Sequence, residues 1–488
     1  MTDSTTRIHA DLCVVGSGIA ALNALAVASG YLEKGRRVVL IEQRARYGGM
    51  WNDAYPFVRL HQPHGLFTAG SIAWQGERPR SYLATREEIL EHFANILGVV
   101  RARVHLDERY GWEFTEHEER DGHVLVRARN AEGEQLEVEA AKLIKGFGIE
   151  VRPDAPLEFA SDRVRSIGPS AIVERRDEVY GGKEPIWIVG GGKTAMDTAH
   201  LLVTEAPGRE VNMIIGGGTF FGKRDRLFPD GNRNRWRMQA TPNMLQAAVA
   251  RRFDGTNEAD VRRWLREQYG IGLVAEANNY FFGILSEAEN AKIARGLTST
   301  VRDYLTDVRD QNGSAELVFR SGVTREVSAG SWVVNCTGLI TPVGRPYEPY
   351  SSPSGNVLTL SLRSATVLLS SFMAYFMTHL MYRDKLTTTP LYQVDYSELA
   401  KVAKPASPYV MATLAQYNLC LLSEALPLRS FVDCGLDFDR WMPLPHRMAA
   451  GISFAARRNR DRSRMRATLD TARDRFGVRC GPLESANV

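Results

Sequence analysis

The sequence has few cysteines, almost no net charge and no metal-ligand pattern. Its 488 residues include five scattered cysteines that form no C-x-x-C pair: Cys13, Cys336, Cys420, Cys434 and Cys480. This spacing argues against a disulfide framework and a metal centre, so we expect reduced, structural thiols. The 61 basic and 57 acidic side chains nearly cancel and leave a net charge of +4. No overall electrostatic field therefore favours nucleic acid or an anionic membrane as a partner.

Apolar runs that would indicate a secretion signal or a membrane span are also scarce. The N-terminus, MTDSTTRIHA, is polar and lacks the apolar core of a signal peptide. The stretch 364–382 is long enough to cross a bilayer, but its Ser, Thr and His residues favour a buried helix. We therefore expect a cytoplasmic protein without stable membrane insertion.

The chain does contain two copies of one nucleotide-binding pattern. In the first copy, IHADLCVV predicts a buried strand, and an apolar helix is predicted after a glycine turn. Gly16 permits the tight turn, Gly18 lets a pyrophosphate approach the backbone, and Ala21 lets the helix lie close to the sheet. The amides at the start of this helix favour an anion.

The strand after this helix indicates which nucleotide the first copy binds. RRVVLIEQR carries Glu42 near its end, at about the twenty-residue spacing expected of a ribose-binding carboxylate. A carboxylate at this place binds ribose hydroxyls and repels a 2′-phosphate. The first copy therefore suits FAD or NAD rather than NADP, with a purely structural turn as the alternative.

The second copy, EPIWIVGGGKTAMDTAHLL, places Gly190, Gly192 and Ala195 at the three small positions, with Thr194 at the start of the helix. Two such copies imply two bound nucleotides. The next strand ends without a carboxylate and leads to a basic segment containing Arg224. A guanidinium fork suits the 2′-phosphate of NADPH, and a solvated basic loop is the alternative.

Further motifs follow in an order that resembles a known family. Gly49 and Trp51 belong to a GGMW loop, Arg59 ends a YPxxR motif, and Gly338 ends a Cys-Thr-Gly junction. Together with GSGIAA and Glu42, they resemble the flavin-containing monooxygenases and their Baeyer–Villiger and N-hydroxylating relatives, the class B flavoprotein monooxygenases. The resemblance implies that these residues contribute to cofactor binding.

The resemblance covers most of residues 8–345 and implies an α/β fold with two Rossmann-like dinucleotide-binding domains. The FAD-binding domain is expected over 1–150, and the NADPH-binding domain over 151–338 with a helical insertion at about 229–302. Residues 339–488 are expected to return to the FAD domain and to add a helical C-terminal region.

The resemblance also implies a reaction. FAD and NADPH together indicate hydride transfer to the flavin, and the lack of paired cysteines argues against a disulfide reductase. Dioxygen is then the expected electron acceptor, and a flavin C4a-hydroperoxide would oxygenate a small organic substrate, an aromatic compound or an amine. A flavoprotein that binds FAD without turnover is the alternative outside the enzymes.

The sequence departs from the family at the residues that would identify a subclass. The segment 159–165 lacks the glycine and the histidine of the F-x-G-x-x-x-H fingerprint, and His61 stands where Baeyer–Villiger members carry an aspartate. Lys193 begins the second helix, where three roles are open to it: contact with an NADPH phosphate, a solvated position, or a role at the flavin. The last role resembles the single-component flavin-dependent halogenases, which make hypohalite from a halide for an aromatic such as an indole or a phenol.

Other side chains are weaker candidates. His61 joins Lys193 as a candidate catalytic residue, because an imidazole can donate to flavin atoms or transfer protons near neutral pH. His64 and His379 are further candidates, and a purely structural histidine is the alternative for each.

Aromatic residues of the insertion either line a pocket or pack in the core: Tyr280, Phe281 and Phe282. The arginine-rich stretch 455–477 predicts a solvated or oligomer-facing helix, in keeping with a homodimer and without the aromatics that nucleic-acid binding needs.

Overall fold

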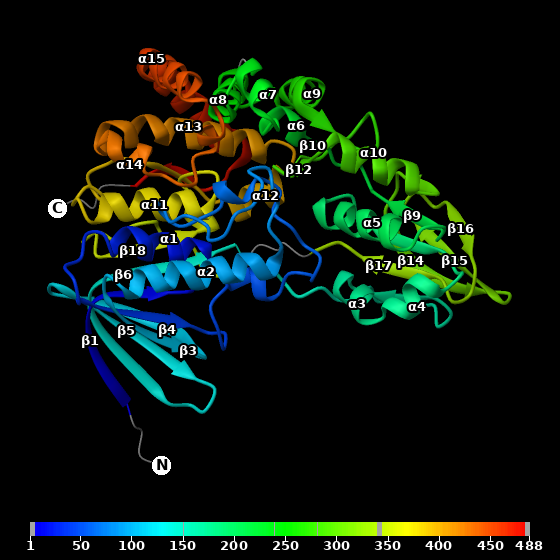
Figure 1. Ribbon diagram of the computed structural model, residues 1–488, viewed down its shortest axis with the longest axis horizontal. Coiled ribbons are helices and arrows are strands. Elements are labelled where there is room, and N and C mark those ends of the chain that lie inside the picture. The colour runs from blue at the N-terminus through cyan, green and yellow to red at the C-terminus, as the bar shows by residue number, and fades with distance from the viewer. Residues whose placement is uncertain (1–4, 150, 239, 281, 339–343, 484–488) are drawn as a thin grey trace.

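The chain folds into two lobes, each built around a sheet that contains parallel strands (Figure 1). The computed structural model describes residues 5–149, 151–238, 240–280, 282–338 and 344–483. Both lobes follow a strand, glycine turn and helix order around parallel strands. The expected α/β class with two Rossmann-like units is therefore confirmed.

The first lobe is centred on a seven-stranded sheet. Its parallel part runs in the order β3 (His105–Tyr110), β2 (Arg37–Glu42), β1 (Thr5–Val15) and β6 (Gln135–Gly148). β18 (Val357–Ser361) pairs in parallel with the C-terminal end of β6, while β5 (His123–Asn130) and β4 (Trp112–Arg120) extend the sheet in antiparallel fashion. β18 thus returns the chain to the first sheet after the second lobe.

Three helices cover one region of this sheet: α1 (Ile19–Ala28), α2 (Arg86–Arg101) and α11 (Ser370–Met381). α1 is apolar on all sides because it lies between the sheet and the other two helices. α2 has one apolar face, and Thr85 and Glu88 form a capping box at its start. The helix that follows the glycine turn, α1, is therefore packed between the sheet, α2 and α11.

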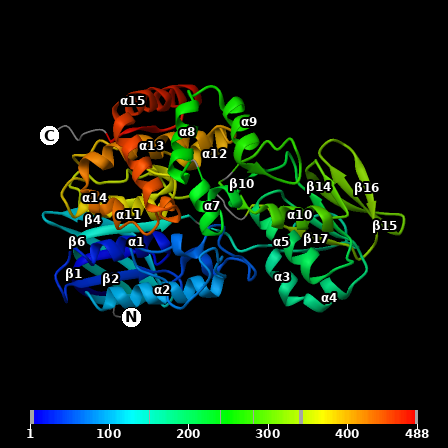
Figure 2. The same ribbon diagram turned by 45° about the horizontal axis from the view of Figure 1, so that its top comes forward.

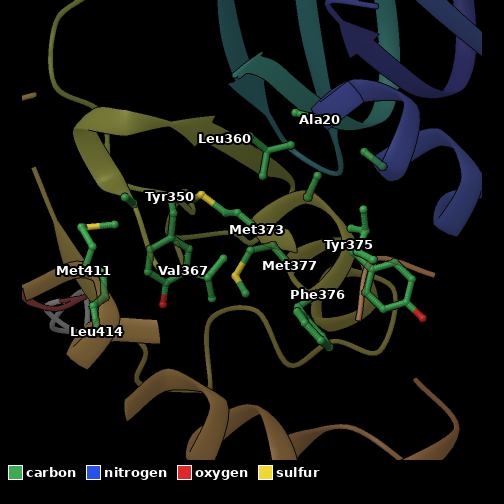
Figure 3. Close-up of a cluster of buried hydrophobic side chains, with 14 of the residues drawn as sticks. Ala20, Tyr350, Leu360, Val367, Met373, Tyr375, Phe376, Met377, Met411 and Leu414 are labelled. Atoms are coloured by element: carbon green, nitrogen blue, oxygen red, sulfur yellow. The ribbon is translucent and has the colours of Figure 1, made fainter. Parts of the chain in front are cut away.

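The main hydrophobic core lies where α11 meets β18 and α13 (Ser407–Ala425). Figure 3 shows Met373 and Met377 of α11 gathered with Tyr350, Leu360 of β18 and Met411 of α13. Methionine side chains adapt to irregular spaces between helices and strands. Ala20 of α1 belongs to the same cluster, so segments that precede and follow the second lobe in the sequence share one core.

The second lobe is centred on a five-stranded sheet in the order β13 (Ser299–Val301), β9 (Val211–Ile214), β8 (Ile186–Val189), β17 (Trp332–Asn335) and β7 (Arg165–Ile167). All its pairs are parallel. The elements around it are α3 (Pro169–Glu174), α4 (Arg176–Gly181), α5 (Lys193–Glu205), α10 (Glu287–Gly296), β14 (Leu305–Gln311), β15 (Ser314–Phe319) and β16 (Thr324–Val327). α5 packs beside α10, and β14 to β16 form a separate antiparallel sheet.

Short elements and helices separate β9 from α10. They are β10 (Phe221–Lys223), α6 (Arg224–Leu227), α7 (Asn232–Arg237), α8 (Pro242–Arg252), α9 (Glu258–Tyr269), β11 (Gly270–Ile271) and β12 (Ile284–Leu285). α8 packs against α13 and α15 (Leu444–Phe476), so this part of the chain lies on the C-terminal helices of the first lobe (Figure 2). The range 229–302 expected for the insertion also contains β13, an edge strand of the second sheet.

The C-terminal region is completed by α12 (Tyr396–Val402), α14 (Leu428–Val432), β19 (Tyr392–Val394) and β20 (Cys480–Pro482). Within the apolar stretch 364–382, the helix α11 covers residues 370–381 and is largely buried, while residues 365–369 are not helical. Among the described residues, no helix combines the length and the apolar composition needed to cross a bilayer. All five cysteines are free thiols. Burial raises the pKa of Cys336 to about 12, which keeps this thiol protonated.

A buried carboxylate joins the insertion to the C-terminal region. Asp439 is 5% exposed and accepts hydrogen bonds from the Thr241 hydroxyl at 2.6 Å and the Asn243 amide at 2.9 Å, both at the start of α8. Burial, and then the charge of Asp437, raise the pKa of Asp439 to about 6. The folded protein therefore binds a proton here that the unfolded chain releases nearer pH 4.

We predict that Asp439→Asn removes part of the pH dependence of stability. Because the folded pKa is raised, the wild-type protein loses stability as pH rises through about 6, by on the order of 2–3 kcal/mol. The neutral amide has no such loss, so the stability of the variant relative to wild type should increase from about pH 4 to about pH 6.5, which spans the window between the two pKa values. Thermal unfolding across this range measures the difference. Asp433→Asn, which removes an exposed carboxylate of the same region, is the control, and equal profiles for all three proteins would contradict the prediction.

Candidate active site

One cavity of about 500 Å³ lies between the first glycine turn, the insertion and the C-terminal helices. Its walls come from the ends of β1 and β2, the loop after β2, the start of β4, α8, and α13. One end is therefore made by the nucleotide-binding unit of the first lobe. The other end is made by helices outside either parallel sheet.

The first glycine turn brings three backbone segments too close for side chains. Gly16 has a φ of +94°, its amide donates to the Ile41 carbonyl at 2.7 Å, and a Cβ there would lie 2.7 Å from the Gly146 oxygen. A Cβ on Gly146 would lie 2.8 Å from the Cβ of Ala21. The small residue at position 21 thus lets α1 lie against β6, as expected from the sequence.

The GGMW loop lies directly against this turn. Gly49 has a φ of +54°, and a Cβ there would lie 2.8 Å from the Cα of Gly18. Trp51 is buried, lines the cavity and meets the edge of Phe67 with ring centroids 5.7 Å apart. Gly18, Gly49 and Trp51 are therefore brought together at the cavity wall.

Glu42 also faces the cavity and is 4% exposed. Its carboxylate accepts hydrogen bonds from the Ser17 amide at 2.9 Å, from the Ser17 hydroxyl at 2.6 Å and from the Arg44 amide at 2.9 Å. These donors hold the carboxylate at the end of β2 and leave lone pairs for a hydroxyl ligand. The positions of Ser17 and Arg44 follow from the turn geometry, and sequence reasoning did not identify them.

Aromatic side chains continue the nucleotide end of the cavity beyond Glu42. Trp112 and Phe114 open β4, and Phe147 lies at the end of β6. The Arg345 guanidinium lies 4.1 Å from the centre of the Phe147 ring. Flat rings and a cation suit an adenine base and its phosphates. The alternation of aromatic residues at the start of β4 was the signal in the sequence for this surface.

The second glycine turn lies in the other lobe. Gly190 has a φ of +133°, and a Cβ there would lie 2.9 Å from the Cys336 oxygen, so only glycine fits. A Cβ on Gly192 would meet no atom within 4 Å, and the side-chain caps that often close a helix start are missing from α5. The turn therefore presents open backbone and free amides, as an anion site requires.

Lys193 connects this turn to the first lobe. Its side chain is 13% exposed and forms an ion pair with Asp197 one helical turn later. The Tyr55 hydroxyl donates to the other carboxylate oxygen of Asp197 at 2.7 Å and is also hydrogen-bonded to Thr194. Lys193 is not among the described residues that line the cavity. The structure thus places it in an inter-lobe hydrogen-bond chain.

His61 lies at the cavity wall near two paired cations. Arg224 donates to the His61 carbonyl at 2.8 Å and to Glu289 at 2.7 Å. Burial, and then the charges of Lys193 and Arg224, lower the pKa of His61 to about 3. The imidazole is therefore neutral near pH 7. Arg224, the predicted contact for a 2′-phosphate, thus lies at this contact between the lobes.

Other expected residues lie away from the cavity. Arg59 is exposed and donates to the Leu83 carbonyl at 2.9 Å, and Gly338 is exposed after β17. His64 packs edge-on against Trp74, and His379 is hydrogen-bonded to the Tyr31 hydroxyl at 2.8 Å. Burial lowers the pKa of both histidines, that of His379 to about 4. None of these four residues lines the cavity in the part of the chain that the structure describes.

The far end of the cavity is mainly apolar, and its polar side chains, such as Gln246 of α8, are uncharged. Tyr280 and Phe282 line it together with Val249, Phe372 and Tyr409. Tyr280 also stacks on the buried Phe220 with ring centroids 4.8 Å apart, so its ring lines the pocket and packs against the core at the same time. The third aromatic of this group, Phe281, lies outside the described residues. The charged side chains among the described cavity residues all lie at the nucleotide end: Glu42, Arg44, Glu113 and Arg345.

The two glycine turns differ in the space beside them. The first opens into the cavity of about 500 Å³, and its glycines, Glu42 and aromatic rings fit an adenine dinucleotide. Beside the second, the void between Gly191 and Val274 measures about 10 Å³. The residues around the second turn therefore do not fit a dinucleotide in this conformation. Within the described residues, no group of three or more His, Cys, Asp or Glu side chains is placed to hold a metal ion.

No family model matches the sequence. Uncharacterised proteins of Mycobacterium tuberculosis and Mycobacterium bovis are 41% identical over 66 residues, which are 14% of this chain and 12% of each relative. The chain thus matches about an eighth of the length of these curated relatives.

Among solved structures, the chain is similar to a mutant of cyclohexanone monooxygenase from Rhodococcus sp. Phi1, with a TM-score of 0.49 and 13% identity over 77% of this chain and 85% of that one. It is similar to a flavin-containing monooxygenase from Stenotrophomonas maltophilia, with a TM-score of 0.40 and 15% identity over 72% and 90%. Bacillithiol disulfide reductase from Bacillus cereus gives a TM-score of 0.44 and 12% identity over 78% and 99%.

Gly18→Ala should weaken dinucleotide binding at the first turn without destabilising the protein. Gly18 has an ordinary φ of −80°, and a Cβ there would lie 3.5 Å from Gly49, so the fold itself accepts alanine. The methyl group would nevertheless lie where the helix amides meet the cavity. We expect roughly tenfold weaker FAD binding, measured by titrating the apoprotein with FAD.

Gly16→Ala is the matched variant. Its Cβ would collide with the Gly146 oxygen at a positive φ, so this change should lower the melting temperature of the apoprotein as well as FAD affinity. Wild-type FAD affinity in Gly18→Ala would contradict the assignment of the turn.

Proposed function

We propose that this chain is an FAD-dependent monooxygenase that takes electrons from NADPH and uses dioxygen to oxygenate a small, neutral aromatic compound. The observation that carries the proposal is the continuous cavity, which joins a dinucleotide-binding turn to an apolar, aromatic pocket. A cofactor held at one end would thus be in contact with a substrate held at the other. The motif order from GSGIAA to YPxxR supports the choice of FAD.

Residues of the first lobe would hold the FAD. The Gly16–Gly18 turn and the free amides of α1 would bind the pyrophosphate, and Glu42 would accept from ribose hydroxyls. Trp112 and Phe114 would hold the adenine end, and the loop containing Trp51 would border the ring system. When bound, FAD supplies hydride acceptance and the activation of dioxygen.

The apolar end would bind the substrate and exclude water. Val249, Phe372 and Tyr409 present carbon surfaces, and water exclusion strengthens polar interactions and limits side reactions in such sites. An ammonium substrate would need a carboxylate partner, but Glu42 and Glu113, the carboxylates among the described cavity residues, lie at the nucleotide end. We therefore favour a neutral aromatic substrate over an amine.

His61 would orient a polar group at the middle of the cavity. Its depressed pKa makes it a neutral imidazole, which can donate from one nitrogen and accept at the other. It would therefore position a group or pass a proton without carrying a charge itself. The Arg224 hydrogen bond to its carbonyl fixes the backbone at this point.

NADPH would bind at the second turn, where Gly190, Gly192 and the amides of α5 form an anion site. Thr194 and Lys193 lie at the start of the same helix and are the nearest side chains for a phosphate. In this conformation the end of β9 leaves no room for the rest of a dinucleotide.

A halogenase that makes hypohalite from a halide for an indole or a phenol is the second candidate. The observation that favours it is the proximity of Lys193 to the cavity wall, since its charge contributes to the lowered pKa of His61. An ammonium group near a flavin would attract an oxidised halogen species. In the present conformation, the ion pair with Asp197 holds Lys193 away from the cavity.

Lys193→Ala should separate the two candidates. Because Lys193 lies at the second turn and is paired with Asp197, we expect on the order of tenfold slower flavin reduction by NADPH, measured anaerobically from flavin absorbance. Product formation from indole or phenol should then be normal when the flavin is reduced chemically. Lys183→Ala, in an exposed loop, is the matched control.

Mass spectrometry of the product with and without bromide completes this experiment. An oxygenated product supports the monooxygenase, and a brominated product with no oxygenated one would overturn it. Normal reduction with loss of a brominated product in Lys193→Ala would assign the lysine to halogen transfer.

His61→Gln should retain most of the activity, whereas His61→Ala should lose on the order of tenfold in kcat/KM. Glutamine keeps a neutral donor and acceptor, and alanine removes both. Because the pKa of His61 is about 3, the wild type and His61→Gln should share one pH profile between about pH 5 and pH 8. A wild-type inflection near pH 6.5, about the pKa of a free imidazole, that disappears in His61→Gln would show that His61 titrates during catalysis.

A further inference from the structure

The end of β9, where the ribose of a second nucleotide would lie, is covered by the chain itself. In Rossmann-like units the group that binds the ribose lies at the end of the strand after the glycine-turn helix. Here Gly216 and Gly218 follow β9 and are buried. A Cβ on Gly216 would lie 2.5 Å from the Tyr304 ring, and a Cβ on Gly218 would lie 2.8 Å from the Val274 side chain.

The covering residues belong mainly to 272–280, called the cover segment below. Its Leu273 and Val274 border the void of about 10 Å³ beside Gly191. A void of this size is at the lower limit for a single water molecule. An adenosine can therefore reach the second turn only if the cover segment moves.

The cover segment is held by hydrogen bonds and not by regular secondary structure, and the side chains of Arg302 and Asn279 contribute to them at 2.9 Å each. The Asn278 amide donates to the Gly217 carbonyl at 3.2 Å, and the Asn279 amide donates to the Gly218 carbonyl at 3.1 Å. Leu273 and Val274 are only half-buried, and the segment from 272 to 278 contains neither helix nor strand. Such segments open at a lower free energy than the core elements beside them.

The other end of the same segment forms part of the cavity wall. Tyr280 lines the cavity and stacks on Phe220 with ring centroids 4.8 Å apart. The Phe220 amide donates to the Asn279 carbonyl at 3.0 Å. Movement at Leu273 and Val274 would therefore be transmitted to the pocket over seven residues or fewer of irregular chain.

We propose that the cover segment and the nucleotide compete for the same space, so that NADPH binding displaces Leu273 and Val274 and shifts Tyr280 in the cavity wall. This inference rests on the proposed use of NADPH. Nucleotide binding and pocket shape are then linked, and the linkage is reciprocal: a ligand that fixes Tyr280 in its present position weakens nucleotide binding.

Hydrogen exchange on the full chain loaded with FAD tests this directly. Saturating NADP⁺ should increase exchange at the amides of Asn278, Asn279 and Phe220, because displacement breaks the hydrogen bonds they donate. A ligand that bound beside an undisplaced segment would protect these amides or leave them unchanged. Either of those results, with NADP⁺ bound, would overturn the inference.

A double variant, Leu273→Ser with Val274→Ser, adds an independent measurement. Shortening both side chains removes apolar contacts that the nucleotide must displace, so NADP⁺ should bind at least about fivefold tighter in a calorimetric titration. Ala275→Ser with Glu276→Ser changes exposed residues of the same segment and is the matched control. Equal affinity in wild type and the double variant would contradict competition.

Flavin reduction separates this inference from the proposed function. If NADPH reduces the flavin while exchange and affinity follow the contradicting results, only the cover-segment inference fails. If NADPH neither binds nor reduces the flavin in wild type or in the double variant, the proposed use of NADPH fails and the inference fails with it.

Discussion

The close contact of three backbones at the first glycine turn is the constraint on which the site depends. Gly16 meets Gly146, Gly18 meets Gly49, and Ala21 meets Gly146, each at a separation that a larger side chain would prevent. These contacts set the distance between α1 and the sheet and bring the GGMW loop against the turn. The cavity begins where they end, so its nucleotide end is set by backbone and not by adjustable side chains.

The two lobes are joined by polar contacts around this rigid turn. Tyr55 of the first lobe donates to Asp197 of the second, and Arg224 of the second lobe donates to the His61 carbonyl of the first. Hydrogen bonds of this kind depend on geometry, and they can be exchanged for hydrogen bonds to other groups at a modest net cost in free energy. The contacts of a packed core cannot be exchanged in this way. These two contacts hold the second lobe against the cavity wall at His61.

Local motifs predicted the parts of the site that depend on backbone geometry. Gly16, Ala21 and Gly49 must be small for steric reasons, and the structure places them together with Gly18 at the turn. The contacts of Arg224 could not be predicted from a local motif, because a long cationic side chain pairs with whichever anion the tertiary fold brings near it. Its partner Glu289 lies 65 residues later in the chain.

The covering of the second glycine turn could not be predicted from the sequence either, because it depends on a tertiary contact. The sequence of the second copy satisfies the nucleotide pattern, and the fold reproduces its strand, turn and helix. What fills the adjoining space is Val274 and Tyr304, whose approach to β9 depends on the path of the insertion and on β14. A motif specifies the backbone of a site but carries no information about which distant segment lies over it.

Charge pairing at the junction determines what the cavity can hold. Lys193 is neutralised by Asp197 and Arg224 by Glu289, so the two cations nearest His61 add little net charge to the wall. Burial of the imidazole is the main cause of the lowered pKa of His61, and the two cations lower it further because their positive charge repels the imidazolium. The middle of the cavity is thus polar without being charged. A neutral substrate gains apolar contact there without leaving a buried charge unpaired, whereas a cation would enter a region that offers it no carboxylate.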